Sequence, residues 1–355
     1  MGRYTTIKDI AKVAGVSHTT VYRALNDKPR ISQSTKEQII SIAQEFNYQP
    51  NVLAQSLVSG RTKTLGLVIT TIVNPFYPEL AKGIEDTARS LGYSIILCCT
   101  NFDISLEKQY IDMLRSRGVD GIIFTSAHIR DPNITRLVED GFPLILVNRR
   151  VHGDPLMDSI NYVVVENAKG GFLAIEHLIR MGHERIGVIS GPSDSSPAVE
   201  RLEGARRAFT EYGLDPGELL VLEGDFLKSS GYEAAKKFLA VEDPPSAIFG
   251  INDYMALGAL EAILDSGLKV PEDIALIGFN DIEFSSLKAI ELTTIGQKKY
   301  EMGSIAVHTL IERIEKGDGD RARQITLEPE LIVRKSCGYH LRGYMIPRQK
   351  EINKI

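Results

Sequence analysis

Apolar side chains recur at helical spacing in three short segments at the start of the chain. Within each segment they fall three or four residues apart, which places them on one face of an α-helix. The three inner faces are Ile7, Ile10, Ala11 and Ala14; Val21, Ala24 and Leu25; and Ile39, Ile42, Ala43 and Phe46. Helices this short are marginal alone, so the pattern predicts a small bundle with one shared core.

Polar residues mark where these helices start and stop. Thr6 and Ser17 can cap the first two helices, and Gly15 ends the first one as a left-handed turn residue would. Ser34 with Glu37 matches a capping box for the third helix. A helix, a short turn with glycine and a second helix make up the helix-turn-helix pattern.

The outward residues of the second helix suit contact with DNA bases. They are His18, Thr19, Tyr22 and Arg23, which all offer hydrogen-bonding groups, and arginine can grip a guanine edge with two bonds. In a helix-turn-helix unit the second helix enters the major groove with its first turn leading. From the pattern alone, a helical bundle with ordinary solvated faces is the alternative.

A fourth short helix is predicted at 52–58, with Asn51 as its cap and Gly60 after its end. Its apolar residues have no place in the three-helix core, so this helix needs a partner, namely its own copy in a dimer together with DNA. Leu57 can then wedge between base steps in the minor groove. A plain interdomain linker is the alternative interpretation.

From Leu65 onward, continuous apolar runs alternate with helical stretches, which is typical of parallel sheets covered on both faces. The expected strands are 65–70, 94–100, 121–126, 143–148, 185–190, 219–224, 246–251 and 274–279. The expected helices are 77–91, 106–117, 168–181, 199–212, 231–239 and 254–265. Two such series predict an α/β core of two doubly wound lobes, the first from 64–163 and 293–324, the second from 164–292 and 325–340.

Open parallel sheets bind ligands beyond the carboxyl ends of their strands, and two facing lobes place those ends across one cleft. The candidates are residues of strand-following segments: Asn74, Phe76, Asn148, Arg149, Arg201, Phe226, Asn252, Asp253, Asn280 and Asp281. Asn74 can instead shape a turn, and we favour helix capping for Asp253. No catalytic set, metal-ligand motif or phosphate loop stands out, so neither an enzyme nor a cofactor is expected.

Charge is unevenly distributed along the chain. Residues 1–62 hold eight basic and four acidic side chains, a net charge of +4, and the total of −5 therefore leaves −9 for the rest. A basic head on an acidic body favours nucleic acid as the partner of the head. Three cysteines without a C-x-x-C pair, a polar N-terminus and no membrane-length apolar run predict a cytoplasmic protein.

Three strings in the head carry a family resemblance: T-I-K-D-I-A-x-x-A-G-V-S, T-V-x-R-x-L-N and N-Y-x-P-N-x-x-A-x-S-L. With them the chain resembles the headpiece and hinge of the LacI/GalR family of bacterial transcription repressors. The resemblance implies that His18, Thr19 and Arg23 read bases and that Leu57 intercalates. The full set of DNA contacts it implies is Thr6, Ser17, His18, Thr19, Thr20, Tyr22, Arg23, Asn26, Asn51, Ala54 and Leu57. Tyr22 replaces a frequent serine and Gln55 a frequent arginine, which points to an unusual operator preference.

The resemblance continues through the body, which is similar to a periplasmic sugar-binding protein. Strings that match effector-contacting segments are N-P-F-Y at 74–77, R-L-E-G at 201–204, G-D-F at 224–226, N-D-Y-M-A-L-G at 252–258 and G-F-N-D at 278–281. Asn148 and Asn280 stand where sugar-binding relatives often carry Asp, and Arg149 and Arg201 add positive charge. We therefore hypothesise a polar effector with some negative charge, such as a sugar acid or sugar phosphate, with neutral sugars and nucleosides as the alternatives.

These observations predict a ligand-controlled transcription repressor. Its expected parts are a helix-turn-helix domain at 1–50, a hinge helix and linker at 51–63, a two-lobed effector and dimerisation domain at 64–340 and a tail at 341–355. Two heads on a palindromic operator strengthen binding through effective concentration, so a homodimer is expected. The lobes would be joined by crossings near 163–165, near 292–295 and around 326. A solute-binding protein and an enzyme on the same scaffold are the alternatives.

Overall fold

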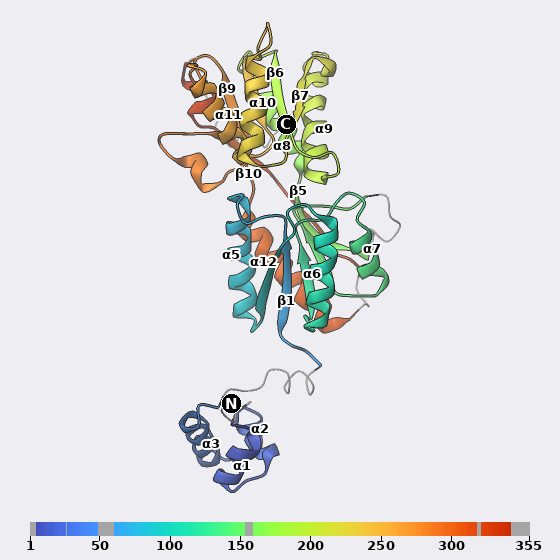
Figure 1. Cartoon of the computed structure of the whole chain (residues 1–355), viewed down its shortest axis with the longest axis vertical. Helices are drawn as coiled ribbons and strands as arrows, with labels where there is room; N and C mark the ends of the chain where they lie inside the picture. Colours follow the sequence, from blue (N-terminus) through green and yellow to red (C-terminus); the bar gives the residue numbers. More distant parts are fainter. Residues whose placement is uncertain (1–4, 26, 49–59, 153–158, 318–320, 342–355) are drawn as a thin grey trace. The chain divides into compact units, whose positions relative to one another are not determined.

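A computed structural model describes the chain over residues 5–25, 27–48, 60–152, 159–317 and 321–341 (Figure 1). The chain divides into two units, Met1–Thr62 and Lys63–Ile355, which are described separately. The second unit contains both lobes. The fourth helix expected at 52–58 and most of the tail lie outside the described residues.

The described part of the first unit contains three helices, α1 (Ile7–Ala14), α2 (His18–Leu25) and α3 (Gln33–Glu45). Their shared core is centred on Ile10, Val21 and Ile39, whose side chains are fully buried. This arrangement confirms the predicted helix-turn-helix bundle.

The first helix begins and ends at the predicted residues, and the second begins at its predicted cap. Thr6 forms a capping box with Asp9 at the start of α1, and Gly15 follows its end with a φ of 66°. The Ser17 Oγ accepts a hydrogen bond of 3.1 Å from the backbone N–H of Thr20 at the start of α2. Local capping chemistry therefore sets these ends.

The predicted cap of the third helix was wrong. Ser32 caps α3, and its Oγ accepts from the backbone N–H of Thr35 at 3.2 Å. The helix begins at Gln33, so Ser34 already lies inside the first turn. Two serines precede the same apolar stripe, and the extended backbone of Ser32 (ψ 148°) makes it the cap.

A parallel six-stranded sheet forms the centre of the first lobe, in the order β11-β5-β4-β3-β1-β2. Its strands are β1 (Thr64–Ile69), β2 (Ser94–Cys99), β3 (Gly121–Phe124), β4 (Leu144–Val147), β5 (Asn161–Val165) and β11 (Gln324–Leu327). Alternate residues of β1 face opposite layers, since Leu67 packs with α5 (Phe76–Ser90) and α12 (Lys299–Lys316). Val68 packs with α6 (Ile104–Ser116) and α7 (Pro132–Glu139) on the other face (Figure 1).

The second lobe repeats this plan, with strand order β12-β10-β9-β8-β6-β7. Its strands are β6 (Ile186–Ser190), β7 (Leu220–Glu223), β8 (Ala247–Gly250), β9 (Ala275–Asn280), β10 (Thr293–Gly296) and β12 (Glu330–Ile332), of which β12 is antiparallel. Its helices are α8 (Asn167–Arg180), α9 (Ser196–Glu211), α10 (Lys228–Leu239) and α11 (Asp253–Asp265). Short 3₁₀ turns lie at Pro216–Glu218, Glu283–Ser286, Lys335–Cys337 and Tyr339–Leu341. The two doubly wound lobes predicted from the sequence are thus confirmed.

Two glycines let α8 and α9 pack backbone against backbone. A Cβ at Gly171 would lie 2.0 Å from the carbonyl oxygen of Arg201, and one at Gly204 would lie 1.9 Å from that of Ala168. Any larger residue at either position would push the helices apart. This close crossing fixes the first half of α9, which carries Arg201.

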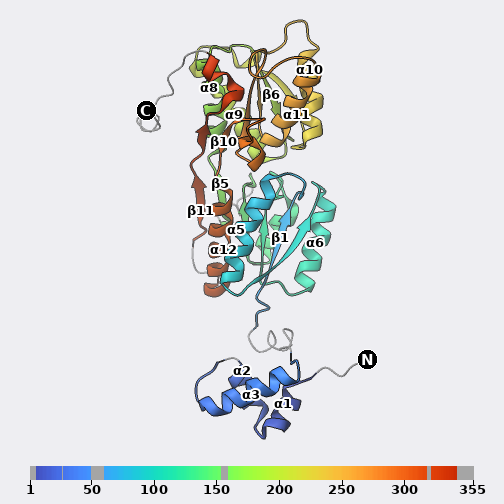
Figure 2. The same cartoon turned by 90° about the vertical axis from the view of Figure 1, so that its left-hand side faces the viewer.

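Three crossings join the lobes, and two of them differ from the predicted boundaries. β10 (293–296) was expected in the first lobe but pairs with β9 of the second. β11 (324–327) was expected mainly in the second lobe but pairs with β5 of the first. The crossings therefore fall at 166, at 297–298 and at 328–329. Figure 2 shows β5, β10 and β11 together on one side of the core, where the lobes join.

Candidate functional site

The exposed face of α2 carries the predicted base-reading residues. His18, Thr19 and Arg23 are exposed, and Tyr22 is half-buried. His18 and Tyr22 are four residues apart, as are Thr19 and Arg23, so each pair lies on consecutive turns of the same helix face. The structure thus brings these four side chains together on the side of α2 that the bundle core does not use.

Hydroxyl groups at the starts of α1 and α2 complete the described part of the predicted DNA interface. The Thr6 hydroxyl donates to the Asp9 carboxylate at 2.7 Å, and the hydroxyls of Ser17 and Thr20 lie 2.9 Å apart. Helix starts present backbone N–H groups that attract phosphate. The other predicted DNA contacts lie outside the described residues: Asn26, Asn51, Ala54 and Leu57.

Eight of the nine predicted effector residues line one recess between the two lobes. These eight are Asn74, Phe76, Asn148, Arg149, Arg201, Phe226, Asn252 and Asn280. The sequence analysis missed six more lining residues: Thr70, Thr71, Tyr77, Phe102, Pro197 and Leu227. Phe102 follows β2, so the rule that found the others could have found it as well. The recess encloses about 30 Å³ of free space, room for about two water molecules, so a larger ligand must move side chains or open the lobes.

The backbone carbonyl of Phe226 ties the two lobes together inside the recess. It accepts hydrogen bonds from Nδ2 of Asn252 at 3.0 Å and from Nδ2 of Asn74 at 3.3 Å. Asn74 belongs to the first lobe, whereas Phe226 and Asn252 belong to the second. The ring of Phe226 also stacks on that of Phe102 in the first lobe, with centroids 6.0 Å apart and planes at 16°.

Arg201 is a fully buried cation on the second-lobe wall. Its Nη1 donates to the carbonyl of Ile251 at 2.7 Å, and its Nε donates to the side-chain oxygen of Asn167 at 2.9 Å. Its guanidinium lies 3.6 Å from the centroid of the Phe279 ring. Burial lowers the pKa of Arg201 to about 9. The side chain is therefore still charged at neutral pH, but its charged form is less stable than it would be in water.

Asn148 and Arg149 form the opposite wall and have polar atoms without partners. Arg149 is 2% exposed and its Nη1 donates to the carbonyls of Ser126 at 3.4 Å and Ala127 at 3.2 Å. The Nε of Arg149 and the Oδ1 of Asn148 are buried and make no hydrogen bond. Such orphaned atoms are rare in buried positions, because each costs free energy.

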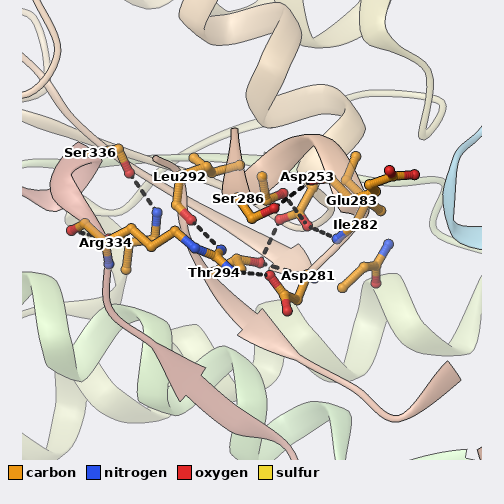
Figure 3. Close-up of polar contacts among 12 residues, drawn as sticks. Asp253, Asp281, Ile282, Glu283, Ser286, Leu292, Thr294, Arg334 and Ser336 are labelled. Atoms are coloured by element: carbon orange, nitrogen blue, oxygen red, sulfur yellow. Dashed lines mark hydrogen bonds and ion pairs between the residues drawn. The ribbon is translucent and has the colours of Figure 1, made fainter. Parts of the chain in front are cut away.

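Asp253 does not have the capping role that we favoured for it. The cap of α11 is Asn252, whose side chain accepts from the backbone N–H of Met255 at 2.7 Å. The Asp253 carboxylate turns to the strand ends behind the recess, where it accepts from the Ile282 N–H at 2.8 Å and the Thr294 hydroxyl at 2.5 Å (Figure 3). A third donor is the Ser285 hydroxyl at 2.9 Å. Asp253 therefore holds the loop after β9 in place.

Asp281 is the one predicted effector residue that does not line the recess. Asn280 and Asp281 both adopt left-handed backbone angles, with φ of 118° and 52°. The Asp281 carboxylate accepts from Nη2 of Arg334 at 2.7 Å (Figure 3). The prediction for Asp281 is corrected accordingly, because the turn of the backbone directs its side chain to Arg334.

Polar side-chain contacts also join the lobes outside the recess. Nδ1 of His128 in the first lobe lies 2.6 Å from Oδ2 of Asp194 in the second. Arg150 in the first lobe donates from Nη2 to Glu200 on α9 at 2.8 Å. These two contacts add polar links between the lobes outside the recess lining.

Neither a metal site nor a membrane span appears in the described part of the chain. No group of three or more His, Cys, Asp or Glu side chains there could hold a metal ion. Among the helices that the structure describes, none has the length and apolar character needed to cross a bilayer.

The chain matches two family profiles. Residues 6–51 match bacterial regulatory proteins of the lacI family. Residues 62–335 match the periplasmic binding proteins and sugar binding domain of the LacI family. The two matches coincide with the helical bundle and with the two lobes.

Similar proteins share this arrangement over nearly the whole length. The HTH-type transcriptional repressor PurR of Aliivibrio salmonicida is 36% identical over 335 residues, which cover 93% of this chain and 98% of the relative. The HTH-type transcriptional regulator DegA of Bacillus subtilis is 37% identical over 335 residues, with 94% and 98% covered. Among solved structures, the lac repressor dimer bound to operator and the anti-inducer ONPF is 29% identical with a TM-score of 0.84, covering 94% of this chain and 99% of that one. The complex of the transcriptional regulator CelR with cellobiose is 32% identical with a TM-score of 0.70 and the same coverage.

Proposed function

Because the chain belongs to the LacI family of DNA-binding transcription regulators, which are not enzymes, we propose that a small effector controls its affinity for operator DNA. The effector is a polar sugar or sugar derivative that binds in the recess between the lobes, and the regulator acts as a repressor. In this proposal the protein works in the cytoplasm, where its operator is.

The recess is the observation that carries the proposal. It is lined from both lobes, and the Asn74–Phe226–Asn252 hydrogen bonds already cross between them. A ligand that contacts both walls stabilises whichever lobe arrangement it fits better, in proportion to its difference in affinity for the two arrangements. The recess can therefore convert ligand binding into a change of lobe arrangement.

On the DNA side, the proposal assigns base reading to the exposed face of α2. His18, Thr19 and Arg23 lie there, and a homodimer would present two such faces to a palindromic operator. The hinge helix expected within 51–63 would pack against its copy on the DNA, with Leu57 as a minor-groove wedge. A lobe movement that separates or joins the two hinges would then lower or raise operator affinity.

Operator binding with and without ligand tests this function. Fluorescence anisotropy of the full-length protein would compare a selected palindrome with a scrambled duplex over a salt series. We expect far tighter binding to the palindrome, a steep salt dependence from phosphate contacts, and a ligand-induced change of about 5- to 150-fold. Equal affinity for both duplexes, or an operator affinity that no recess ligand changes, would contradict the proposed function.

A further inference from the structure

Among the described residues that line the recess there are two buried guanidinium groups and no carboxylate. Arg149 on the first lobe and Arg201 on the second are each 2% exposed. Burial is the main cause of the lowered pKa of Arg201; Glu200 and Asp253 act against it, and the nearby Arg149 adds to it. The wall of the recess is therefore positively charged.

The nearest carboxylates are already held by other donors. Glu200 accepts from Arg150 at 2.8 Å and from Nδ2 of Asn167 at 2.9 Å. Asp253 accepts its three hydrogen bonds from the loop and strand behind the recess. Neither carboxylate makes an ion pair with Arg201 or Arg149 in the described structure. Burying a cation without a paired anion is costly, so a ligand that brings the anion would relieve the cost.

The orphaned atoms indicate what else the ligand carries. The unpartnered Nε of Arg149 is a donor, and the unpartnered Oδ1 of the adjacent Asn148 is an acceptor. An anionic oxygen satisfies the first, and only a donor such as a hydroxyl group satisfies the second. The rings of Phe102 and Phe226 lie near the Arg149 guanidinium, at 5.3 and 5.8 Å from their centroids. Together these groups fit a compound with both a negative charge and a hydroxyl group.

We propose that the ligand of this recess is a small hydroxylated anion, whose carboxylate or phosphate binds Arg149 and whose hydroxyl donates to Asn148. This inference rests on the proposed function, because it names the chemical class of the effector of the same recess. Arg201 supplies the second positive charge from the opposite lobe. A ligand held by both arginines bridges the lobes and so favours one arrangement of them.

Calorimetry and thermal unfolding of the full-length protein with matched ligands test the charge. The probes are glucuronate against glucose, glucose 6-phosphate against glucose, and benzoate and inorganic phosphate as anions without the sugar body. We expect a hydroxylated anion to bind at least tenfold more tightly than its neutral partner and than the bare anions. The glucuronate and phosphate arms separate the two kinds of anion. Tighter binding of glucose or of a purine base, or no stabilisation by any anion at millimolar concentration, would overturn the proposal.

Variants at the first-lobe wall test the assigned residues. Arg149→Gln removes the charge but keeps a donor for the Ser126 and Ala127 carbonyls, and should weaken anion binding roughly 10- to 100-fold. Asn148→Asp suits the left-handed backbone there (φ 65°) and places a carboxylate beside Arg149, so it should abolish the preference for anions over their neutral partners. The control is Arg136→Gln, an exposed arginine on α7, which should leave every affinity unchanged. Unchanged anion affinity in both Arg149→Gln and Asn148→Asp would refute the assignment.

Operator binding measured on the same samples separates the two proposals. A neutral ligand that binds the recess and changes operator affinity would overturn the proposed anionic ligand class but support the regulatory function. An anion that binds through Arg149 but leaves operator affinity unchanged would support the ligand class and contradict its regulatory role.

Discussion

Polar atoms in the recess between the lobes are less completely hydrogen-bonded than two buried carboxyl groups outside it. Asp253 in the second lobe has three donors, and Glu107 in the first lobe accepts from the Ser126 hydroxyl at 2.5 Å and from Nδ2 of Asn133 at 3.1 Å. In the recess, the Nε of Arg149 and the Oδ1 of Asn148 have no partner. The two regions are equally buried, so burial alone does not distinguish them.

Unpartnered buried atoms also occur away from the recess, in Tyr93, Ser195 and Gln297, so a missing partner marks a ligand-facing group only where the residue also lines the recess. A fully hydrogen-bonded carboxyl group such as Asp253 holds loops and strand ends at a fixed distance, and its loss leaves its donors unsatisfied. Asn148 and Arg149, which keep atoms without hydrogen bonds, contribute nothing comparable to the stability of the unliganded fold. Changes at such carboxyl groups should therefore affect stability, and changes in the recess wall should affect ligand affinity.

The largest expected effect is the loss of Asp253. Asp253→Ala removes the acceptor of three buried donors and should lower the free energy of unfolding by about 3 kcal/mol. Urea unfolding of the full-length protein measures it, with the exposed Glu272→Ala as the control. A loss under about 1 kcal/mol would show that these hydrogen bonds do not hold the loop after β9. It would also contradict the claim that fully hydrogen-bonded buried carboxyl groups stabilise the fold.

Glu107 gives the next effect, and its sign depends on pH. Burial and then the nearby Asp131 raise the pKa of Glu107 from 4.5 to about 7. The folded state therefore holds the proton more tightly, so the wild type loses stability as pH rises from about 4.5 to 7 and stays penalised above 7. Glutamine mimics the protonated form.

Glu107→Gln should thus match the wild type in thermal unfolding near pH 4, below the unfolded pKa. Near pH 8 it should be more stable, by roughly 2 kcal/mol. A variant that is less stable than the wild type at pH 8 would mean that the ionised Glu107 carboxylate stabilises the folded protein. That result would contradict the predicted penalty for its charge.

Lys299 tests the buried polar contacts beside the crossing at 297–298. This buried lysine donates to the carbonyls of Asn280 at 2.8 Å and Asp281 at 2.7 Å, and its Nζ lies 3.1 Å from Glu79 on α5. Lys299→Met should lower the free energy of unfolding by about 1.5 kcal/mol. The neighbouring Lys298, exposed and paired with Glu301, offers the control Lys298→Met. Equal effects of the two substitutions in urea unfolding would remove the special role of Lys299.

The smallest effect is expected at Asp281. Asp281→Asn weakens a partly exposed contact with Arg334, so stability should fall by less than about 1 kcal/mol. Effector affinity, measured by calorimetry, should stay within about twofold, because this side chain does not line the recess. A tenfold loss of affinity would restore Asp281 to the effector site and reverse our correction.

Much of this architecture could be predicted from the sequence because the deciding patterns are local. Apolar runs predicted eight of the described strands but not β5, β10, β11 or β12, and the strand-end rule found eight lining residues. The choice of sheet for β10 and β11 could not be predicted in this way. Both are short strands that mix polar and apolar residues, and only pairing with β9 or β5 distinguishes the two sheets.

Side-chain direction was the other feature that the sequence did not reveal. Asp253 and Asp281 both follow strands, as the true lining residues do. The left-handed backbone at Asp281 and the three donors around Asp253 turn both carboxylates away from the recess. Helix α12 was also missed, although Met302, Ala306 and Leu310 show its helical spacing in the sequence.

The central claim is that a ligand between the lobes controls operator binding through the recess wall. The most direct measurement is the operator affinity of the wild type and of Arg149→Gln, followed by fluorescence anisotropy while a hydroxylated anion such as glucuronate or glucose 6-phosphate is titrated. We predict that the ligand shifts wild-type affinity by about 5- to 150-fold and that the variant needs roughly 10- to 100-fold more ligand for the same shift. Superimposable titrations of the two proteins, or no shift in the wild type with any ligand that binds the recess, would contradict the claim.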